Sequence, residues 1–209
     1  MTMITKTSIK EQVYQIIKKK IYDQEYDFGD TINITALSKE LGVSNTPIRE
    51  ALSRLEVEGL VKTTMSTKVQ VISLDEKEFA ECAISFFVTA FGAYTLCCEE
   101  NKTEKLVELM DAALAEQRKA FEEQNFTDYI DKSNAFDRTF AVATGNERVL
   151  QSYDNLASIF YPIVRLQHSR ADYNREENLR QHEEIRDAIA SGDFMKTKDL
   201  LYNHFNKHL

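Results

Sequence analysis

The hydrophobic positions in the first third of the chain repeat with the period of an amphipathic helix. Three such stretches cover about residues 8–22, 34–41 and 45–58. Gly42 suits the turn between the second and third stretches, and Ser44 can cap the third helix by accepting a hydrogen bond from a first-turn amide. The third helix is predicted to bury Ile48, Ala51, Leu52 and Leu55 and to expose Asn45, Thr46 and Arg49.

Short β-branched runs alternate with these helices. They are "TIN" at 31–33, "LVKTT" at 60–64 and "KVQVIS" at 68–73. The last two are joined by "MST" and predict a small antiparallel hairpin. Helix, strand, helix, turn, helix and hairpin is the order of a winged helix-turn-helix, so residues 1–74 are predicted to form such a DNA-binding domain.

From Leu74 onward the hydrophobic pattern is helical throughout. Six stretches are predicted, separated by short polar breaks, at about residues 75–99, 103–123, 126–143, 146–168, 174–190 and 193–208. Residues 75–209 are therefore expected to form an all-α six-helix bundle, and the whole chain a mainly α fold.

The first of these six stretches contains the longest uncharged run. Cys82 to Cys98 includes seventeen residues without a charge, flanked by Glu81 and Glu99. A membrane span usually needs about 20 apolar residues and basic flanks. We therefore expect no membrane span, but a helix buried on most of its circumference in a bundle core or a dimer interface.

Charge is unevenly distributed between the two parts. Residues 1–74 hold ten Lys and Arg against nine Asp and Glu, a net charge of +1, whereas the remainder holds sixteen against twenty-five, a net charge of −9. The acidic overall balance therefore does not exclude nucleic acid as a partner of the first part. The N-terminus lacks a secretory pattern and the three cysteines lack metal-like spacing, which predicts a cytoplasmic protein.

Two parts of the chain resemble known families. "LGVSNTPIREALSRLEVEGLV" is similar to the recognition segment of the GntR family of bacterial transcription regulators. "AFDRTFAVATGNERVL" and "RQHEEIRDAIASGDFMKTKDLLYNHF" resemble the helical FCD ligand-binding domain of the FadR subfamily. The resemblance implies a homodimeric repressor or activator that binds a palindromic operator and responds to a small effector bound in the helical, dimerising domain.

The DNA-binding residues follow from the exposed face of the recognition helix. Arg49 can donate two hydrogen bonds to a guanine in the major groove, and Asn45 can pair with adenine. Ser44, Thr46 and the helix N-terminus suit phosphates. In the wing, Lys62 and Lys68, with Thr63, Thr64, Ser66 and Thr67, are assigned to the DNA backbone. The competing interpretation pairs Arg49 with Glu50 or Glu56 on a solvated helix.

The FCD resemblance also implies a divalent metal held by an Asp-x-x-x-His pair and two later histidines. In this chain the Asp falls at Ser133 and the first His at Asp137, while His182 and His204 match. Two imidazoles and a carboxylate can still bind Zn, Ni, Fe or Mn with open positions. The alternative is a metal-free pocket in which Asp137 is hydrogen-bonded to a histidine. His208 is a substitute ligand candidate.

The effector is expected to be an organic acid, because chelation at such a metal suits a carboxylate. Arg165 is the candidate donor to that carboxylate, beside Asp137, His182 and His204. A larger apolar ligand is the alternative, although Phe86, Phe87 and Phe91 more simply form a core stripe.

Two other functions remain open: a metal-dependent hydrolase built on Asp137, His182 and His204, and a helical interaction protein that binds no DNA.

Overall fold

The structure, a computed structural model, describes residues 8–23, 25–64, 68–168 and 173–206. It divides into two compact units, Met1–Ser73 and Leu74–Leu209. The predicted hairpin tip "MST" and the candidate ligand His208 lie outside the described residues.

The first unit contains three helices, α1 (Ile9–Tyr22), α2 (Ile34–Leu41) and α3 (Asn45–Val57). Both α1 and α2 pack against α3. Asn33 caps α2, its side chain accepting a hydrogen bond from the Ala36 amide at 3.0 Å, and Gly42 ends that helix in the left-handed region with φ 64°. Ser44 occupies the capping position of α3, but its side chain makes no capping hydrogen bond. That part of the sequence prediction was wrong.

A small antiparallel sheet completes the first unit. The strands are β1 (Thr31–Ile32), β2 (Val61–Thr63) and β3 (Val69–Val71), in the order β1-β3-β2. Strands β2 and β3 form the predicted hairpin, with Lys62 opposite Gln70, and β1 adds to its other edge, with Ile32 opposite Val69. Helix-turn-helix and wing are therefore both present, which confirms the predicted winged helix-turn-helix.

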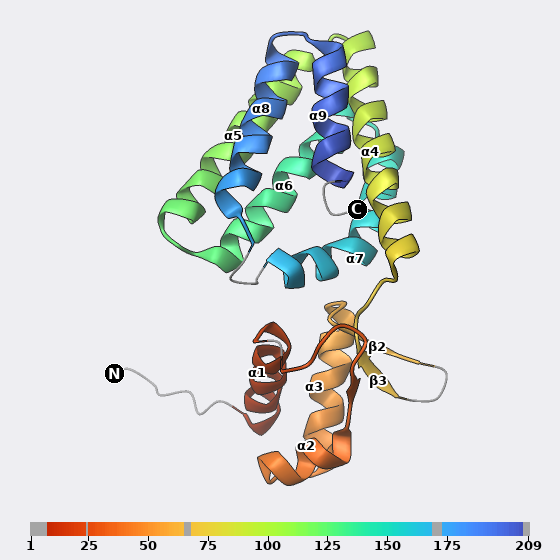
Figure 1. The fold of residues 1–209 in the computed structure, drawn as a ribbon, viewed down its shortest axis with the longest axis vertical. Helices are drawn as coiled ribbons and strands as arrows, with labels where there is room; N and C mark the ends of the chain where they lie inside the picture. The colour runs from red at the N-terminus through yellow and green to blue at the C-terminus, as the bar shows by residue number, and fades with distance from the viewer. Residues whose placement is uncertain (1–7, 24, 65–67, 169–172, 207–209) are drawn as a thin grey trace. The chain divides into compact units, whose positions relative to one another are not determined.

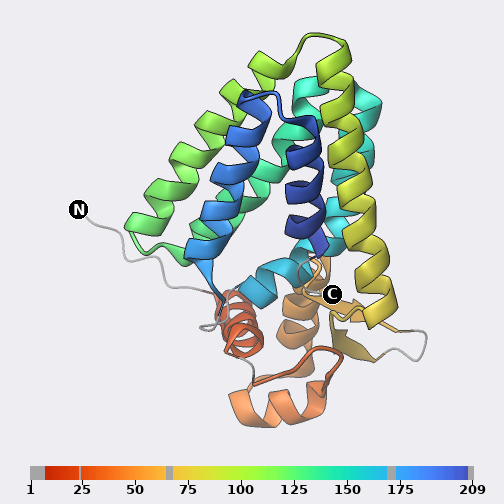
Figure 2. The ribbon, with the colours of Figure 1, turned by 45° about the horizontal axis from the view of Figure 1, so that its top comes forward.

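The second unit is all helical in its described residues. Its six helices are α4 (Glu76–Glu99), α5 (Thr103–Glu122), α6 (Phe126–Thr144), α7 (Glu147–His168), α8 (Arg175–Ala190) and α9 (Phe194–Asn206). In both ribbon views α8 lies along α5, and α9 lies along α4 (Figures 1 and 2). A core of aromatic and aliphatic side chains fills the interior, with Phe86, Phe136, Phe140 and Tyr153 fully buried.

Helix α4 carries the long uncharged run. It is long and apolar enough to cross a membrane by length and composition, and 33% of its most apolar window is buried inside the structure. Phe86, Ala90 and Ala93 face the core, whereas Val88 is 60% exposed and Ile84 39% exposed. Within the single chain one face of α4 therefore packs in the bundle and the other is open, so the bundle core does not bury most of the circumference. Burial of the open face in a dimer interface stays a prediction.

Candidate functional site

The exposed face of α3 is the first candidate site. Ser44, Asn45, Thr46 and Arg49 are all exposed, while Ile48 and Leu52 on the opposite face are buried. Among the described residues, no acidic side chain lies within ion-pair distance of the Arg49 guanidinium. Glu56 instead accepts a hydrogen bond from the Thr63 amide at 2.6 Å. The arrangement therefore gives no support to a pairing of Arg49 with Glu50 or Glu56.

The other arginine of α3 is in a different situation. Arg54 donates to Glu11 on α1 at 2.7 Å, and its guanidinium carbon lies 3.7 Å from the centroid of the Tyr14 ring. Lysines of α1 are also engaged within the unit, since Lys18 lies 2.8 Å from Glu58 and Lys20 lies 2.9 Å from Glu40. These cations hold the helices together, whereas Arg49 faces solvent.

The wing contributes exposed lysines. Lys62 on β2 is exposed and its amine donates to the Ser73 carbonyl at 3.2 Å. Lys68, just before β3, is exposed as well. Thr63 is exposed and Thr64 is partly buried, while Ser66 and Thr67 fall outside the described residues. The described part of the wing thus presents two lysines beside α3 in the same unit.

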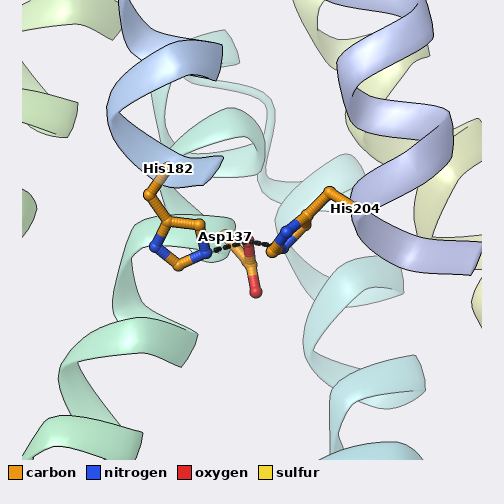
Figure 3. A group of neighbouring side chains, drawn as sticks. All are labelled: Asp137, His182 and His204. Carbon is orange, nitrogen blue, oxygen red and sulfur yellow. Dashed lines mark hydrogen bonds and ion pairs between the residues drawn. The ribbon is translucent and has the colours of Figure 1, made fainter. Parts of the chain in front are cut away.

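The second candidate site is a cluster of three side chains inside the helical unit. Asp137 on α6, His182 on α8 and His204 on α9 point toward one another (Figure 3). Asp137 Oδ1 lies 3.2 Å from His204 Nε2 and 3.7 Å from His182 Nε2, and all three ligand atoms lie within 4.8 Å of one another. The side chain of His182 is fully buried, and those of His204 and Asp137 are 9% and 10% exposed.

Each imidazole is held on its far side by a glutamine. His182 Nδ1 lies 2.9 Å from Gln117 Oε1, and the ring stacks on Phe136 with centroids 4.1 Å apart. His204 Nδ1 lies 3.3 Å from Gln181 Oε1. Both histidines therefore turn the Nε2 atom toward Asp137.

Ser133, where the FCD pattern has an acidic ligand, joins a different network. Its hydroxyl donates to Asn178 Oδ1 at 3.0 Å, and the same oxygen accepts from Gln117 at 3.0 Å. The Tyr129 hydroxyl lies 2.8 Å from that oxygen and 2.6 Å from the Arg175 carbonyl. Burial raises the pKa of Tyr129, so this phenol stays a hydrogen-bond donor. Ser133 thus supports the cluster through buried neighbours and replaces no metal ligand.

Asp137 and His204, but not His182, line a cavity of about 50 Å³, which has room for roughly three or four water-sized groups. Its lining includes polar side chains, Ser133, Asp137, Asn178, Gln181 and His204, and aromatic ones, Phe79, Phe86, Phe160, Tyr161 and Phe205. Burial and the nearby Asp137 carboxylate raise the pKa of Tyr161, which keeps it protonated. No Lys or Arg is among the described residues that line the cavity.

Arg165, the candidate donor to an effector carboxylate, does not line this cavity. Its guanidinium lies 3.4 Å from the Asp131 carboxylate on α6. The structure therefore gives no support to the role predicted for Arg165, because this ion pair holds its charge elsewhere. Phe86 lines the cavity and is also part of the core, whereas Phe87 and Phe91 stack on each other outside the cavity lining, 5.7 Å apart.

The donor set fits a divalent metal. An ion about 2.1 Å from each tetrahedral ligand places neighbouring ligands roughly 3.4 Å apart. The two distances from Asp137 to the imidazoles, 3.2 and 3.7 Å, bracket that value. Among the described residues, these imidazoles are also the only basic groups within ion-pair distance of the buried Asp137. Two nitrogens and one oxygen would leave open positions for a ligand.

Comparisons with known proteins agree with both units. The family model described as "FCD domain" matches residues 91–207, more than half of the chain, and that described as "Bacterial regulatory proteins, gntR family" matches residues 9–65. The chain belongs to the GntR family, with an FCD domain. A GntR-family protein with an FCD domain is a DNA-binding transcription regulator, and the chain is one.

Relatives of this GntR-family regulator extend over nearly its whole length. An uncharacterized HTH-type transcriptional regulator, YdhC of Bacillus subtilis (strain 168), is 27% identical over 93% of this chain and 87% of its own. A probable D-xylose utilization operon transcriptional repressor of Paenarthrobacter nicotinovorans is 23% identical over 99% and 89%. The solved structure of Lar of Listeria monocytogenes, 17% identical over 98% and 96%, shares the fold with a TM-score of 0.66.

Several residues of the regulator's cluster were not found from the sequence. Gln117 contacts Asn178, 61 residues away, and His182, 65 residues away, while Gln181 contacts His204, 23 residues away. Polar helix residues usually face solvent, so the sequence does not indicate these contacts. Gln117 carries one usable signal, because it occupies a position on the buried stripe of α5, beside Leu114 and Ala120. A polar residue in an apolar stripe indicates a buried hydrogen-bonded role.

Proposed function

We propose that this regulator binds a palindromic operator as a homodimer and that the cluster in its FCD domain binds a divalent metal together with a small effector. The observation that carries the effector part is the convergence of Asp137, His182 and His204 beside a cavity that Asp137 and His204 line together with polar and aromatic side chains. Two copies are needed because each helix-turn-helix reads one half-site.

Operator recognition is assigned to the exposed start of α3. Arg49 would contact a guanine and Asn45 an adenine, while Ser44, Thr46, Lys62 and Lys68 would contact the DNA backbone. The exposure of these side chains and the absence of an acidic partner at Arg49 among the described residues support this assignment. We assign residues 1–74 to DNA binding and residues 75–209 to effector binding and dimerisation.

The sign of control is proposed to be repression, because one relative is described as a probable operon repressor. The metal would be Zn, Ni, Fe or Mn, held by Asp137, His182 and His204, and it would act as a Lewis acid toward an effector carboxylate. Since no Lys or Arg lines the described cavity, a bound cation would be the group that neutralises that carboxylate. We do not retain Arg165 in this role.

The function is tested by gel-shift titration of the full chain against the DNA upstream of its own gene. Retention is expected to be sequence-specific and to weaken steeply as salt rises, because phosphate contacts release counterions. A shuffled fragment of the same length is the control. Equal retention of both fragments, or none at low salt, would exclude this DNA as an operator and count against the operator proposal.

The effector part has its own test. Metal analysis of the purified protein and melting curves with added Zn²⁺, Ni²⁺ or Mn²⁺ report whether the cluster binds a cation, since a ligand that binds only the folded state raises the melting temperature. Organic acids are then added to the metal-loaded protein in the gel shift. A protein that neither contains metal nor is stabilised by any of these ions would contradict the metal proposal.

A further inference from the structure

Gln117 and Gln181, which contact the far sides of the two imidazoles, bear on how the cluster is organised. We propose that Gln117 and Gln181 are positioning residues that fix both imidazoles as the Nδ1–H tautomer and so present two Nε2 lone pairs beside the Asp137 carboxylate. This inference concerns residues that are not ligands themselves. Its consequence for cation affinity rests on the proposed metal-binding function, but the tautomers can be measured without any metal.

At His204 a neighbouring carboxylate orients the glutamine amide. Gln181 Nε2 donates to Glu177 Oε1 at 3.0 Å, and an ionised carboxylate only accepts hydrogen bonds. This contact orients the amide, so Gln181 Oε1 is the atom that faces His204 Nδ1 at 3.3 Å. Because a carbonyl oxygen cannot donate, Nδ1 must carry the hydrogen. In the neutral ring, Nε2 then has the lone pair, 3.2 Å from Asp137 Oδ1.

His182 repeats this arrangement from another helix. Gln117 Nε2 donates to Asn178 Oδ1 at 3.0 Å, which turns Gln117 Oε1 toward His182 Nδ1 at 2.9 Å. The Asn178 oxygen lies 3.0 Å from the Ser133 hydroxyl, while the Tyr129 hydroxyl has the Arg175 carbonyl as its nearer acceptor at 2.6 Å. The Gln117–Asn178 contact therefore carries the assignment at His182. Gln117 and His182 are fully buried, so the pair is held by the core.

The outcome is three hydrogen-bond acceptors that face one another, two Nε2 atoms and one carboxylate oxygen. The lone pairs of these three atoms repel one another unless a cation lies between them. In metal sites generally, a ligating histidine donates its other N–H to an acceptor, as both Nδ1 atoms do here toward the glutamines. The metal-free alternative, in which an imidazole donates to Asp137, requires a hydrogen on Nε2. The glutamines oppose that arrangement for the neutral rings.

The tautomers are read from imidazole ¹⁵N chemical shifts of the full-length, metal-free protein at a pH where both rings are neutral. The wild type is expected to show the Nδ1–H form at His182 and His204. Gln181→Met should release His204 alone, and Gln117→Met should release His182 alone. Gln151→Met, the same change at an exposed residue of α7, is the matched control and should alter neither ring.

Zn²⁺ affinity, measured by competition with a coloured chelator, provides the second readout. Each glutamine variant should bind about 10- to 100-fold more weakly than the wild type, the usual effect of removing an outer-shell partner. Gln181 is half-buried, so its variant should fold even if the fully buried Gln117 variant does not, and circular dichroism checks both.

The results separate this inference from the proposed function. Nε2–H forms in the wild type, or unchanged tautomers and Zn²⁺ affinity in Gln181→Met, would overturn the role of the glutamines. The expected tautomers in a wild type that binds no divalent ion would support the positioning role and overturn the metal function. Expected tautomers, Zn²⁺ binding and selective loss in the variants would support both.

Discussion

Asp137 Oδ1 lies 3.2 Å from His204 Nε2, although 67 residues separate the two in the chain. Asp137 comes from the middle of α6 and His204 from the last described turns of α9, and both helices pack against α4. The cluster is therefore a product of the bundle and not of any local motif. Its two histidines are held from behind by hydrogen bonds to Gln117 and Gln181, which orients them before a ligand arrives.

Replacing Asp137 with alanine should abolish stabilisation by divalent ions. Wild-type protein with Zn²⁺ at 100 times its Kd should gain about 2.7 kcal/mol of unfolding free energy, or roughly 5 to 11 °C in melting temperature for a chain of this size. Asp137→Ala removes the one anionic ligand, so this rise should be lost. Differential scanning fluorimetry with and without Zn²⁺ measures it.

The control for that change lies on the same helix. Asp131 is exposed, and its carboxylate is 3.4 Å from Arg165 outside the cavity lining. Asp131→Ala should keep the full Zn²⁺-induced rise. The assignment of Asp137 as a ligand would be wrong if both variants responded to Zn²⁺ as the wild type does.

The two arginines of α3 should separate DNA binding from stability. Arg49→Ala should weaken specific operator binding by about 1 to 3 kcal/mol, roughly 5- to 150-fold, because a bidentate guanine contact is lost. Its melting temperature should stay unchanged, since the side chain is exposed and has no acidic partner among the described residues. Fluorescence anisotropy against specific and shuffled DNA, with parallel melts, measures both quantities.

Arg54→Ala is the matched comparison. It removes the 2.7 Å contact with Glu11 and the stacking over Tyr14, so the melting temperature of the first unit should fall. Operator affinity at a temperature where the variant is folded should change little. If Arg54→Ala lost specificity and Arg49→Ala did not, the recognition face would have to be reassigned.

The helices were predictable because each carries its own local signals. Observed helix limits differ from the expected ones by about one residue, since capping residues such as Asn33 and Asp75 and left-handed residues such as Gly42 and Gly145 mark the ends. What failed depended on tertiary structure. The exposure of Val88 could not be read from an uncharged run, because composition does not say which face of a helix is covered.

The cluster was predictable only in part. Asp137, His182 and His204 were placed together by resemblance to a family pattern, and the structure brings them together. Arg165 was predicted from its charge on a nearby helix, but the direction of a side chain depends on packing, and its guanidinium pairs with Asp131. The contacts of Gln117 and Gln181 were not predicted, because they cross between helices.

Acidification should weaken the first unit through Glu58. Burial alone would raise the pKa of this carboxyl, but hydrogen bonds from Lys18 at 2.8 Å and Tyr14 at 2.6 Å outweigh it and lower the pKa. A depressed folded-state pKa means that the stabilisation is complete above the unfolded value, about 4.3, and is lost as pH falls through the folded value. Hydrogen exchange of α1 amides between pH 3 and 6 follows this loss.

Glu58→Gln should flatten that pH dependence and lower stability at pH 6, because the charge-assisted contact with Lys18 disappears. Glu50→Gln makes the same change on an exposed residue of α3 and serves as the control. The role given to Glu58 would be contradicted if both variants kept the acid sensitivity of the wild type.

Phe86 should be a stability determinant as well as a cavity wall. It is fully buried, and its ring centroid lies 5.3 Å from that of Tyr153, 5.5 Å from that of Tyr161 and 5.7 Å from that of Phe205. Phe86→Ala should cost about 3 to 5 kcal/mol, the usual cost of truncating a core phenylalanine. Val88→Ala, two residues away and 60% exposed, should cost under about 0.5 kcal/mol. Urea unfolding of the helical unit in the full chain measures both, and equal costs would contradict the packing described for α4.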